Sequence, residues 1–323
     1  MKYEDFAEQV KNSIAEYMGD AAEVKEMVVL KNNAVRLHGI SVLPQEGNVS
    51  PTIYLDDFFK EYEKGKAFHD IVAEIIGRYE KSKPSTTVNI DFFTDYSKVR
   101  KRVLCKLVSY DKNVELLEDI PHVRYLDLAI VFYCMILHDE IGPATILVNN
   151  GHMEMWSVTA EELYQAAEQN TRKLLGFQIK GIEDIMTEML IQSLQEELEQ
   201  VYDDEYPSDE DIAEFAACML HSASGLDGKV PMYVLSNREK MNGAACLLYR
   251  DVLSDFADEL NQDLFIIPSS IHEVILVPTH ESVGYERLTQ MVQEVNATQV
   301  EADEILADHV YYFSRDQREV FSM

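Results

Sequence analysis

The sequence predicts an α+β fold in three parts: an N-terminal mixed domain with an antiparallel β meander, a helical acidic bridge, and a C-terminal βαββαβ sandwich of the ferredoxin-like kind. Three observations predict this fold. Some segments repeat apolar residues every three or four positions, as helices do, whereas others are short β-branched runs typical of strands. The two kinds are interleaved along the chain. The chain has 323 residues, 46% of them hydrophobic, so it can bury more than one core.

We expect the N-terminal domain to span 1–157, the acidic helical bridge 158–228 and the C-terminal domain 229–323. The stretch GLDGK at 225–229 is the predicted boundary, because glycine and aspartate favour loops over helices and strands. The sequence shows no repeat of solenoid length and no low-complexity linker.

The first predicted elements are a helix and a hairpin. Apolar residues recur on one helical face of 4–18, with charged residues on the other. The β-branched runs 24–30 and 34–44 follow. They are joined through Asn32 and Asn33, and asparagine tolerates the positive φ that a tight turn requires.

Two helices and a β meander complete the N-terminal domain. Helical spacing returns over 52–65 and 66–84. The β-rich segments of the predicted meander are 103–110, 114–119, 125–137 and 144–156. In the last of these, Asn150 and Gly151 form the dipeptide that is most typical of a two-residue type I′ turn, so we expect a hairpin there.

The bridge is predicted to be helical and acidic. Thr159 and Glu162 fit a capping box, which places the start of a helix at this point. Between Lys180 and Lys229 the sequence contains no lysine or arginine. The helical spacing in this stretch is interrupted at Pro207, which predicts two helices joined by an acidic elbow.

The C-terminal domain is predicted from six segments that alternate in character. Strand, helix, strand, strand, helix and strand patterns follow one another at 231–236, 241–260, 264–268, 273–278, 285–297 and 309–314, and the segment 241–260 is either one helix or a pair of helices. This is the order of a split βαβ, ferredoxin-like sandwich, in which the second and third strands form a hairpin.

The charge of the chain excludes several classes of partner. Aspartate and glutamate number 58 against 28 lysines and arginines, which gives a formal net charge of −30. Nucleic acids and anionic membranes are bound mainly through lysine and arginine, so we exclude them as main partners. The first residues do not resemble an export signal, and the apolar run Leu128–Leu137 is far shorter than the roughly twenty residues of a membrane helix. We expect a soluble, cytoplasmic protein.

Neither the cysteines nor the glycines predict a cofactor. The cysteines at positions 105, 134, 218 and 246 form no CxxC pair and stand among apolar neighbours, so we expect reduced thiols in the core. No GxGxxG and no Walker pattern is present.

The stretch LFIIPSSIHEVILVP sets two apolar runs around a polar group of Ser269, Ser270, His272 and Glu273. The favoured interpretation is a structural turn between two strands, and the next is a loop that contacts a ligand. A third makes Ser270 a nucleophile and His272 its base, supported by Glu273 or Asn237. A serine nucleophile also needs an orienting group and an oxyanion hole, and no G-x-S-x-G elbow precedes Ser270.

Three other positions are weaker candidates. His152 and Glu154 lie two residues apart and would share one face of a strand, which suits a metal ion, although solvent-facing polar residues explain them better. Asn237 follows a strand and is a candidate ligand-binding residue, although helix capping explains it equally well.

The chain resembles a family of uncharacterised bacterial proteins, the domain of unknown function 5688. The resemblance spans nearly the whole length, through segments such as PTIYLDDFFKEYEKG, PHVRYLDLAIVFY, EMWSVTAEELYQAAEQNT, MYVLSNREKMNGAACLLY, LFIIPSSIHEVILVP and VNATQV. The last third is also similar to a second uncharacterised family with a PSSxHE loop. Neither resemblance implies an activity, a cofactor or a catalytic residue.

We therefore expect a non-catalytic binding or scaffold protein that uses its acidic surface or the loop Ser269–Glu273. The expected partner is a basic protein or a small ligand, because complementary charge accelerates encounter. The alternative is a hydrolase of unknown substrate that uses Ser270 and His272.

Overall fold

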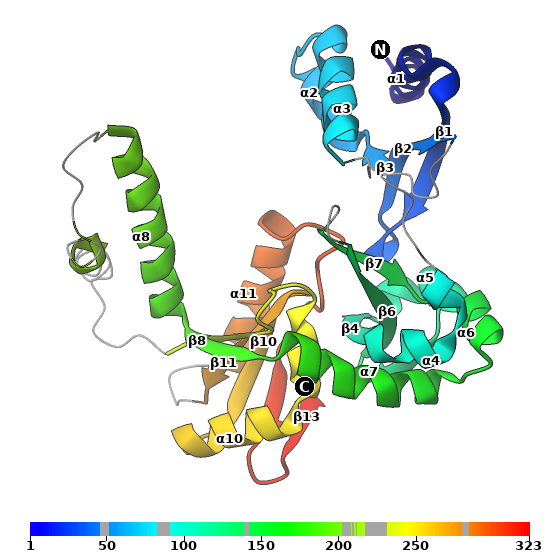
Figure 1. Cartoon of the computed structure of the whole chain (residues 1–323). Helices are drawn as coiled ribbons and strands as arrows, with labels where there is room; N and C mark the ends of the chain where they lie inside the picture. The colour runs from blue at the N-terminus through cyan, green and yellow to red at the C-terminus, as the bar shows by residue number, and fades with distance from the viewer. Residues whose placement is uncertain are drawn as a thin grey trace. The chain divides into compact units, whose positions relative to one another are not determined.

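The protein is described by a computed structural model that covers 1–45, 52–82, 91–138, 142–201, 208, 210, 212–216, 231–279 and 284–323. The chain forms two compact units, Met1–Thr171 and Arg172–Met323 (Figure 1). Both mix helices with antiparallel sheets, so the predicted α+β class is confirmed. The predicted boundary at 225–229 and the acidic elbow at Pro207 lie outside the described residues, and the division into three domains stays a prediction.

The first unit begins with a three-stranded antiparallel sheet and three helices. These elements are α1 (Tyr3–Met18), β1 (Ala22–Leu30), β2 (Arg36–Pro44), β3 (Thr52–Tyr54), α2 (Asp56–Glu63) and α3 (Phe68–Ser82), with sheet order β1-β2-β3. The predicted hairpin is present, and Asn33 has the expected positive φ of 58°. The buried side chains Phe6, Val10, Ile40 and Ile71 join the helices to the sheet in one apolar core.

The second sheet of this unit is built around one long strand. Its elements are α4 (Tyr96–Val99), β4 (Val103–Ser109), α5 (Val114–Asp119), β5 (His122–Tyr125), β6 (Leu128–His138), β7 (Gly142–Leu147), α6 (Asn150–Trp156) and α7 (Ala160–Leu175). Strand β6 pairs with β4, β5 and β7, all antiparallel. The predicted capping box of α7 is confirmed, because Glu162 N donates to Thr159 Oγ1 at 3.2 Å and Thr159 N donates to Glu162 Oε2 at 2.9 Å.

Two local predictions in this region are wrong. The segment 114–119 is helix α5 and not a strand. The predicted hairpin turn at Asn150 and Gly151 is the first turn of helix α6. Asn149 caps this helix: its Oδ1 accepts from His152 N at 2.9 Å, while His152 Nδ1 accepts from Asn149 N at 3.1 Å. This reciprocal capping box satisfies two backbone donors at once, and the helix forms in place of the turn.

The second unit contains a six-stranded antiparallel sheet. Its elements are β8 (Gln178–Gly181), α8 (Ile182–Val201), β9 (Tyr233–Ser236), the 3₁₀ helix η6 (Gly243–Leu248), α10 (Arg250–Leu260), β10 (Leu264–Ser270), β11 (Glu273–Pro278), α11 (Tyr285–Thr298), β12 (Tyr311–Ser314) and β13 (Glu319–Ser322). The sheet order is β13-β12-β10-β11-β9-β8. The predicted βαββαβ order of β9, α10, β10, β11, α11 and β12 is present.

The strand order differs from the ferredoxin-like prediction. The hairpin strands β10 and β11 are the middle pair, whereas a ferredoxin-like sheet has its first and third strands in the middle. The sheet also gains β8 at one edge and β13 at the other. Strand β8 comes from the predicted acidic bridge and pairs with β9, with Gln178 opposite Ser236. The order of elements along the sequence does not determine the order of strands in the sheet. In both arrangements the second strand pairs with the third, and only the neighbours of this hairpin differ.

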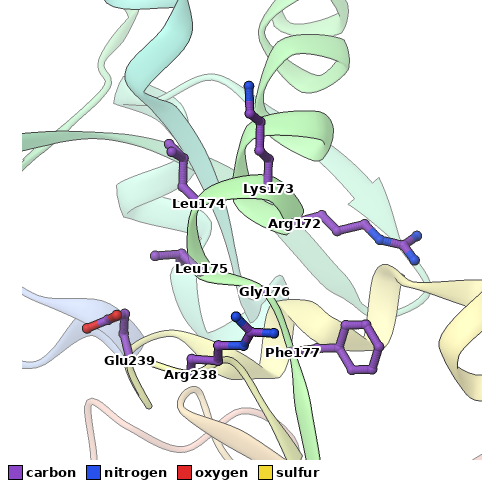
Figure 2. Close-up of a pocket in the computed structure, with 8 residues that line it drawn as sticks. All are labelled: Arg172, Lys173, Leu174, Leu175, Gly176, Phe177, Arg238 and Glu239. Atoms are coloured by element: carbon purple, nitrogen blue, oxygen red, sulfur yellow. The ribbon is translucent and has the colours of Figure 1, made fainter.

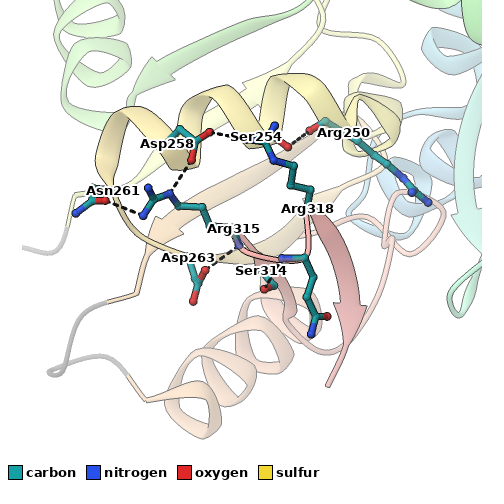
Figure 3. A network of polar contacts seen from close by, with 9 residues as sticks. Arg250, Ser254, Asp258, Asn261, Asp263, Ser314, Arg315 and Arg318 are labelled. Carbon is teal, nitrogen blue, oxygen red and sulfur yellow. Dashed lines mark hydrogen bonds and ion pairs between the residues drawn. The ribbon is translucent and has the colours of Figure 1, made fainter.

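A polar network fixes the hairpin of β12 and β13 to helix α10 (Figure 3). Arg315 Nε donates to Asp258 Oδ1 at 2.6 Å, and its Nη1 donates to Asn261 Oδ1 at 2.7 Å. Asp263 Oδ1 accepts from Arg315 N at 2.8 Å, and its Oδ2 accepts from the Tyr312 hydroxyl at 2.5 Å. The network joins the end of α10 to the end of β12, beside the turn that leads into β13.

Candidate functional site

The polar group around residue 270 is the turn of the hairpin formed by β10 and β11. Leu264 pairs with Pro278 and Ser270 pairs with Glu273, so the chain reverses at Ile271 and His272. The Ser270 hydroxyl accepts a hydrogen bond from His272 N at 3.0 Å, and the Ser269 hydroxyl donates to Glu273 Oε1 at 3.3 Å. Serine hydroxyls commonly satisfy turn amides in this way.

The imidazole of His272 holds two other segments in place. Its Nδ1 accepts from Asn242 N at 3.1 Å, and its Nε2 lies 3.4 Å from Glu304 Oε1. Because a backbone N–H can only donate, the lone pair of the neutral ring is on Nδ1 and is used by Asn242. The ring proton is then on Nε2, directed to Glu304. His272 therefore offers Ser270 no lone pair, and the contacts of both residues are those of a rigid turn.

A second loop packs tightly on this turn. We call residues Ser236–Gly243 the SNREKMNG loop. The Ser236 hydroxyl donates to His272 O at 2.8 Å. A Cβ atom built on Gly243 would lie 2.1 Å from Ser236 Oγ and 2.4 Å from His272 O, so only glycine fits at this position. The two loops are in close contact at Gly243, and any larger residue at this position would force them apart.

The internal geometry of the SNREKMNG loop is also fixed. The Asn237 side chain is buried, donates to Met241 O at 2.8 Å and accepts from Met241 N at 3.3 Å. Lys240 and Asn242 have positive φ angles of 52° and 55°. Such conformations cost free energy in residues other than glycine and persist only where the surroundings fix them. Asn237 therefore shapes the loop and does not face solvent.

The loop presents Arg238 and Glu239 to a surface hollow of about 380 Å³ (Figure 2). The rest of the lining comes from the end of α7 and the link to β8, through Arg172, Lys173, Leu174, Leu175, Gly176 and Phe177. The sequence prediction missed Gly176 and Phe177. The available signal was a glycine directly after a helical segment, which predicts a helix end but not a site.

The two candidate metal ligands, His152 and Glu154, do not share the face of a strand. His152 and Glu154 lie in helix α6, where residues two apart do not face each other. His152 Nδ1 is already an acceptor for the backbone N–H of Asn149. Burial lowers the pKa of His152. In the described part of the chain, no group of three His, Cys, Asp or Glu side chains could hold a metal ion.

The three cysteines that the structure describes are core residues, as predicted. Cys105, Cys134 and Cys246 are buried and form no disulfide, while Cys218 lies outside the described residues. Burial raises the pKa of the Cys105 thiol to about 11 and that of Cys134 to about 12. These two thiols stay protonated near neutral pH and are poor nucleophiles.

Helix α8 differs from the other long helices because its side chains are not buried. Every α8 side chain that the structure describes is half-buried or exposed. Met186 is 46% exposed and Met189 is 67% exposed. The helix follows β8, an edge strand of the sheet (Figure 1).

Comparison with known proteins identifies the family of the chain. The model of a family described as "Family of unknown function (DUF5688)" matches residues 3–315. No curated protein and no solved structure matches the chain. No helix in the described ranges is long and apolar enough to cross a membrane.

Proposed function

The chain belongs to the DUF5688 family, whose function is unknown, and we propose that it is a non-catalytic binding protein that docks a basic, amphipathic segment of another protein on helix α8. The observation that carries this proposal is an apolar face of α8 that includes two exposed methionines, Met186 and Met189. The face consists of Ile182, Ile185, Met186 and Met189, which recur at the spacing of one helical side.

An exposed helix with this pattern is unusual. Most helices of this length are stabilised by burying an apolar face against the rest of the protein. Methionine is common on surfaces that bind helical peptides, because its side chain is unbranched and adapts to different partners. The α8 face therefore has the composition of a peptide-binding surface.

The charge around the face determines which partner fits. Acidic residues are frequent along α8, and the sequence has no lysine or arginine between Lys180 and Lys229. Lys180 pairs with Glu188, with Nζ to Oε1 at 2.7 Å, and neutralises one carboxylate. A second copy of the chain would bring like charges together, whereas a basic segment would be attracted. The partner that fits is a helix with apolar residues on one side and lysine or arginine on the other.

The test uses a synthetic peptide of leucine and lysine whose leucines recur at helical spacing. We expect saturable binding by calorimetry, weaker at high salt because the attraction is screened. The double variant Met186→Gln, Met189→Gln keeps the length of the side chains and removes their apolar character. We expect it to bind about tenfold more weakly.

Two controls make this test specific. Met291→Gln changes an exposed methionine of α11, 37% exposed, and should leave binding unchanged. A peptide in which glutamate replaces lysine should not bind. Equal affinity of the wild type and the double variant, or no saturable binding of the lysine peptide, would overturn the proposal.

A further inference from the structure

The hollow beside the SNREKMNG loop shares no lining residue with helix α8. The main chain of Arg238 is fixed at the edge of the hollow, because Arg238 N donates to Leu175 O at 3.1 Å. A Cβ atom on Gly176 would lie 3.1 Å from Arg238 Nε and 3.3 Å from Arg238 Cδ. The absence of a side chain at Gly176, whose φ is +62°, lets the arginine side chain lie against the main chain. Figure 2 shows the guanidinium beside Gly176.

The cations of the hollow differ in how they are neutralised. Arg172 is fully paired, with Nη1 donating to Asp251 Oδ1 at 2.8 Å and Nη2 to Asp251 Oδ2 at 2.5 Å. Within the described ranges, the side chains of Arg238 and Lys173 contact no carboxylate. Glu239 lines the same hollow, but its carboxylate points away from the guanidinium (Figure 2). In a chain whose acids outnumber its bases two to one, an unpaired arginine in a hollow is a marked feature.

Apolar surface lies next to these charges. Phe177 is 37% exposed and Leu174 is 50% exposed, and both line the hollow. Ligand sites generally combine apolar walls with a few fixed polar groups in this way. A guanidinium presents two parallel N–H donors that match the two oxygens of a carboxylate or phosphate.

We propose that the hollow binds a small oxyanion, a carboxylate or a phosphate ester, that carries an apolar or aromatic body. Arg238 binds the oxyanion and Phe177 contacts the apolar body, whereas the side chains of Lys173 and Leu174 point away from Arg238 (Figure 2). Ser236, Asn237 and His272 take part indirectly, because they fix the loop from which Arg238 projects.

Calorimetric titration of the full chain with phenyl phosphate and, separately, with benzoate tests this proposal. We expect at least one of them to bind saturably, and the tighter of the two identifies the class of oxyanion. Arg238→Gln should weaken that binding about tenfold or more, because a charge-assisted hydrogen-bond pair is lost. Arg238→Lys, which keeps the charge but not the paired donors, should give an intermediate loss.

Two further variants complete the experiment. Glu239→Gln removes a negative charge from the hollow and should strengthen binding severalfold. Arg287→Gln removes one positive charge from an exposed position on α11 and should leave binding unchanged. The proposal is overturned if neither compound binds saturably, or if Arg238→Gln binds as tightly as the wild type. Unchanged circular dichroism of each variant shows that the fold is intact.

Discussion

The polar residues around position 270 stabilise a turn, which is the favoured interpretation of the sequence, and they do not form a nucleophile and base pair. Both ring nitrogens of His272 are engaged, by Asn242 N and by Glu304. Ser270 accepts a backbone hydrogen bond. The sequence correctly predicts that these residues form a turn. It contains no signal that places Arg238 of the neighbouring SNREKMNG loop beside Gly176, because this arrangement depends on a contact between segments about sixty residues apart.

His152 gives a prediction about pH. Its Nδ1 accepts from Asn149 N, and a protonated imidazole would lose this acceptor. Burial lowers the pKa of His152 below the ordinary value of about 6.5. His152 therefore binds a proton more readily in the unfolded chain than in the folded protein. The stability that neutral His152 contributes is present above about pH 6.5 and is lost as the pH falls through the pKa of His152 in the folded protein.

The variant His152→Gln tests this, because glutamine supplies a capping acceptor that does not titrate. We expect wild type and variant to have similar free energies of unfolding near pH 8. Near pH 5.5 the wild type should be less stable by about 0.5–1 kcal/mol. Urea unfolding followed by Trp156 fluorescence measures both values. His69→Gln, at a histidine side chain that is 93% exposed, is the control and should track the wild type at both pH values. A constant difference between wild type and His152→Gln at both pH values would contradict the prediction.

Among the elements, amphipathic helices and β-branched strands were predicted correctly and short polar segments were not. The hairpin of β1 and β2, helix α7 and the order from β9 to β12 follow from local patterns that tertiary contacts support. The segment after β7 was predicted wrongly because Asn150 and Gly151 favour a turn only when the flanking residues pair. Trp156 is buried and donates from Nε1 to Phe93 O at 2.7 Å, which holds this segment as a helix.

The network between α10 and the β12–β13 hairpin depends on Asp263. Asp263→Ala removes the acceptor of both the Tyr312 hydroxyl and Arg315 N. We expect a loss of about 1–3 kcal/mol in the free energy of unfolding, measured with urea by circular dichroism. Glu259→Ala changes the charge equally at an exposed position near the end of α10 and should change stability by less than about 0.5 kcal/mol. Equal losses for the two variants would show that the network does not stabilise the hairpin.

A titration provides a second test of the same contact. The hydrogen bond to Asp263, followed by burial, raises the pKa of Tyr312 to about 12. The folded state therefore favours the protonated phenol, and this part of the stability is lost as the pH rises through about 10 to 12. In Asp263→Asn the pKa of Tyr312 should fall toward 10, which ultraviolet difference spectra measure. If the pKa of Tyr312 is unchanged in Asp263→Asn, the hydrogen bond to Asp263 is not the cause of the raised pKa.

For the whole molecule, the formal net charge of −30 dominates behaviour in solution. Like charges repel in the compact state, and salt screens that repulsion. We expect the midpoint of thermal unfolding to rise by about 2–5 °C between about 10 mM and 300 mM sodium chloride, measured by circular dichroism. A midpoint that falls with salt would mean that the favourable ion pairs outweigh the repulsion.

The same salt series should weaken binding of the basic peptide to α8, so stability and binding should respond in opposite directions.

The outer strands of the six-stranded sheet have a consequence for self-assembly. Strands β8 and β13 contain four residues each, and β8 includes Lys180. A sheet can recruit further chains only through unpaired backbone groups along an edge, and short edges that carry a lysine offer little template for such growth. The two margins of this sheet therefore leave little backbone on which the strand of another chain could pair.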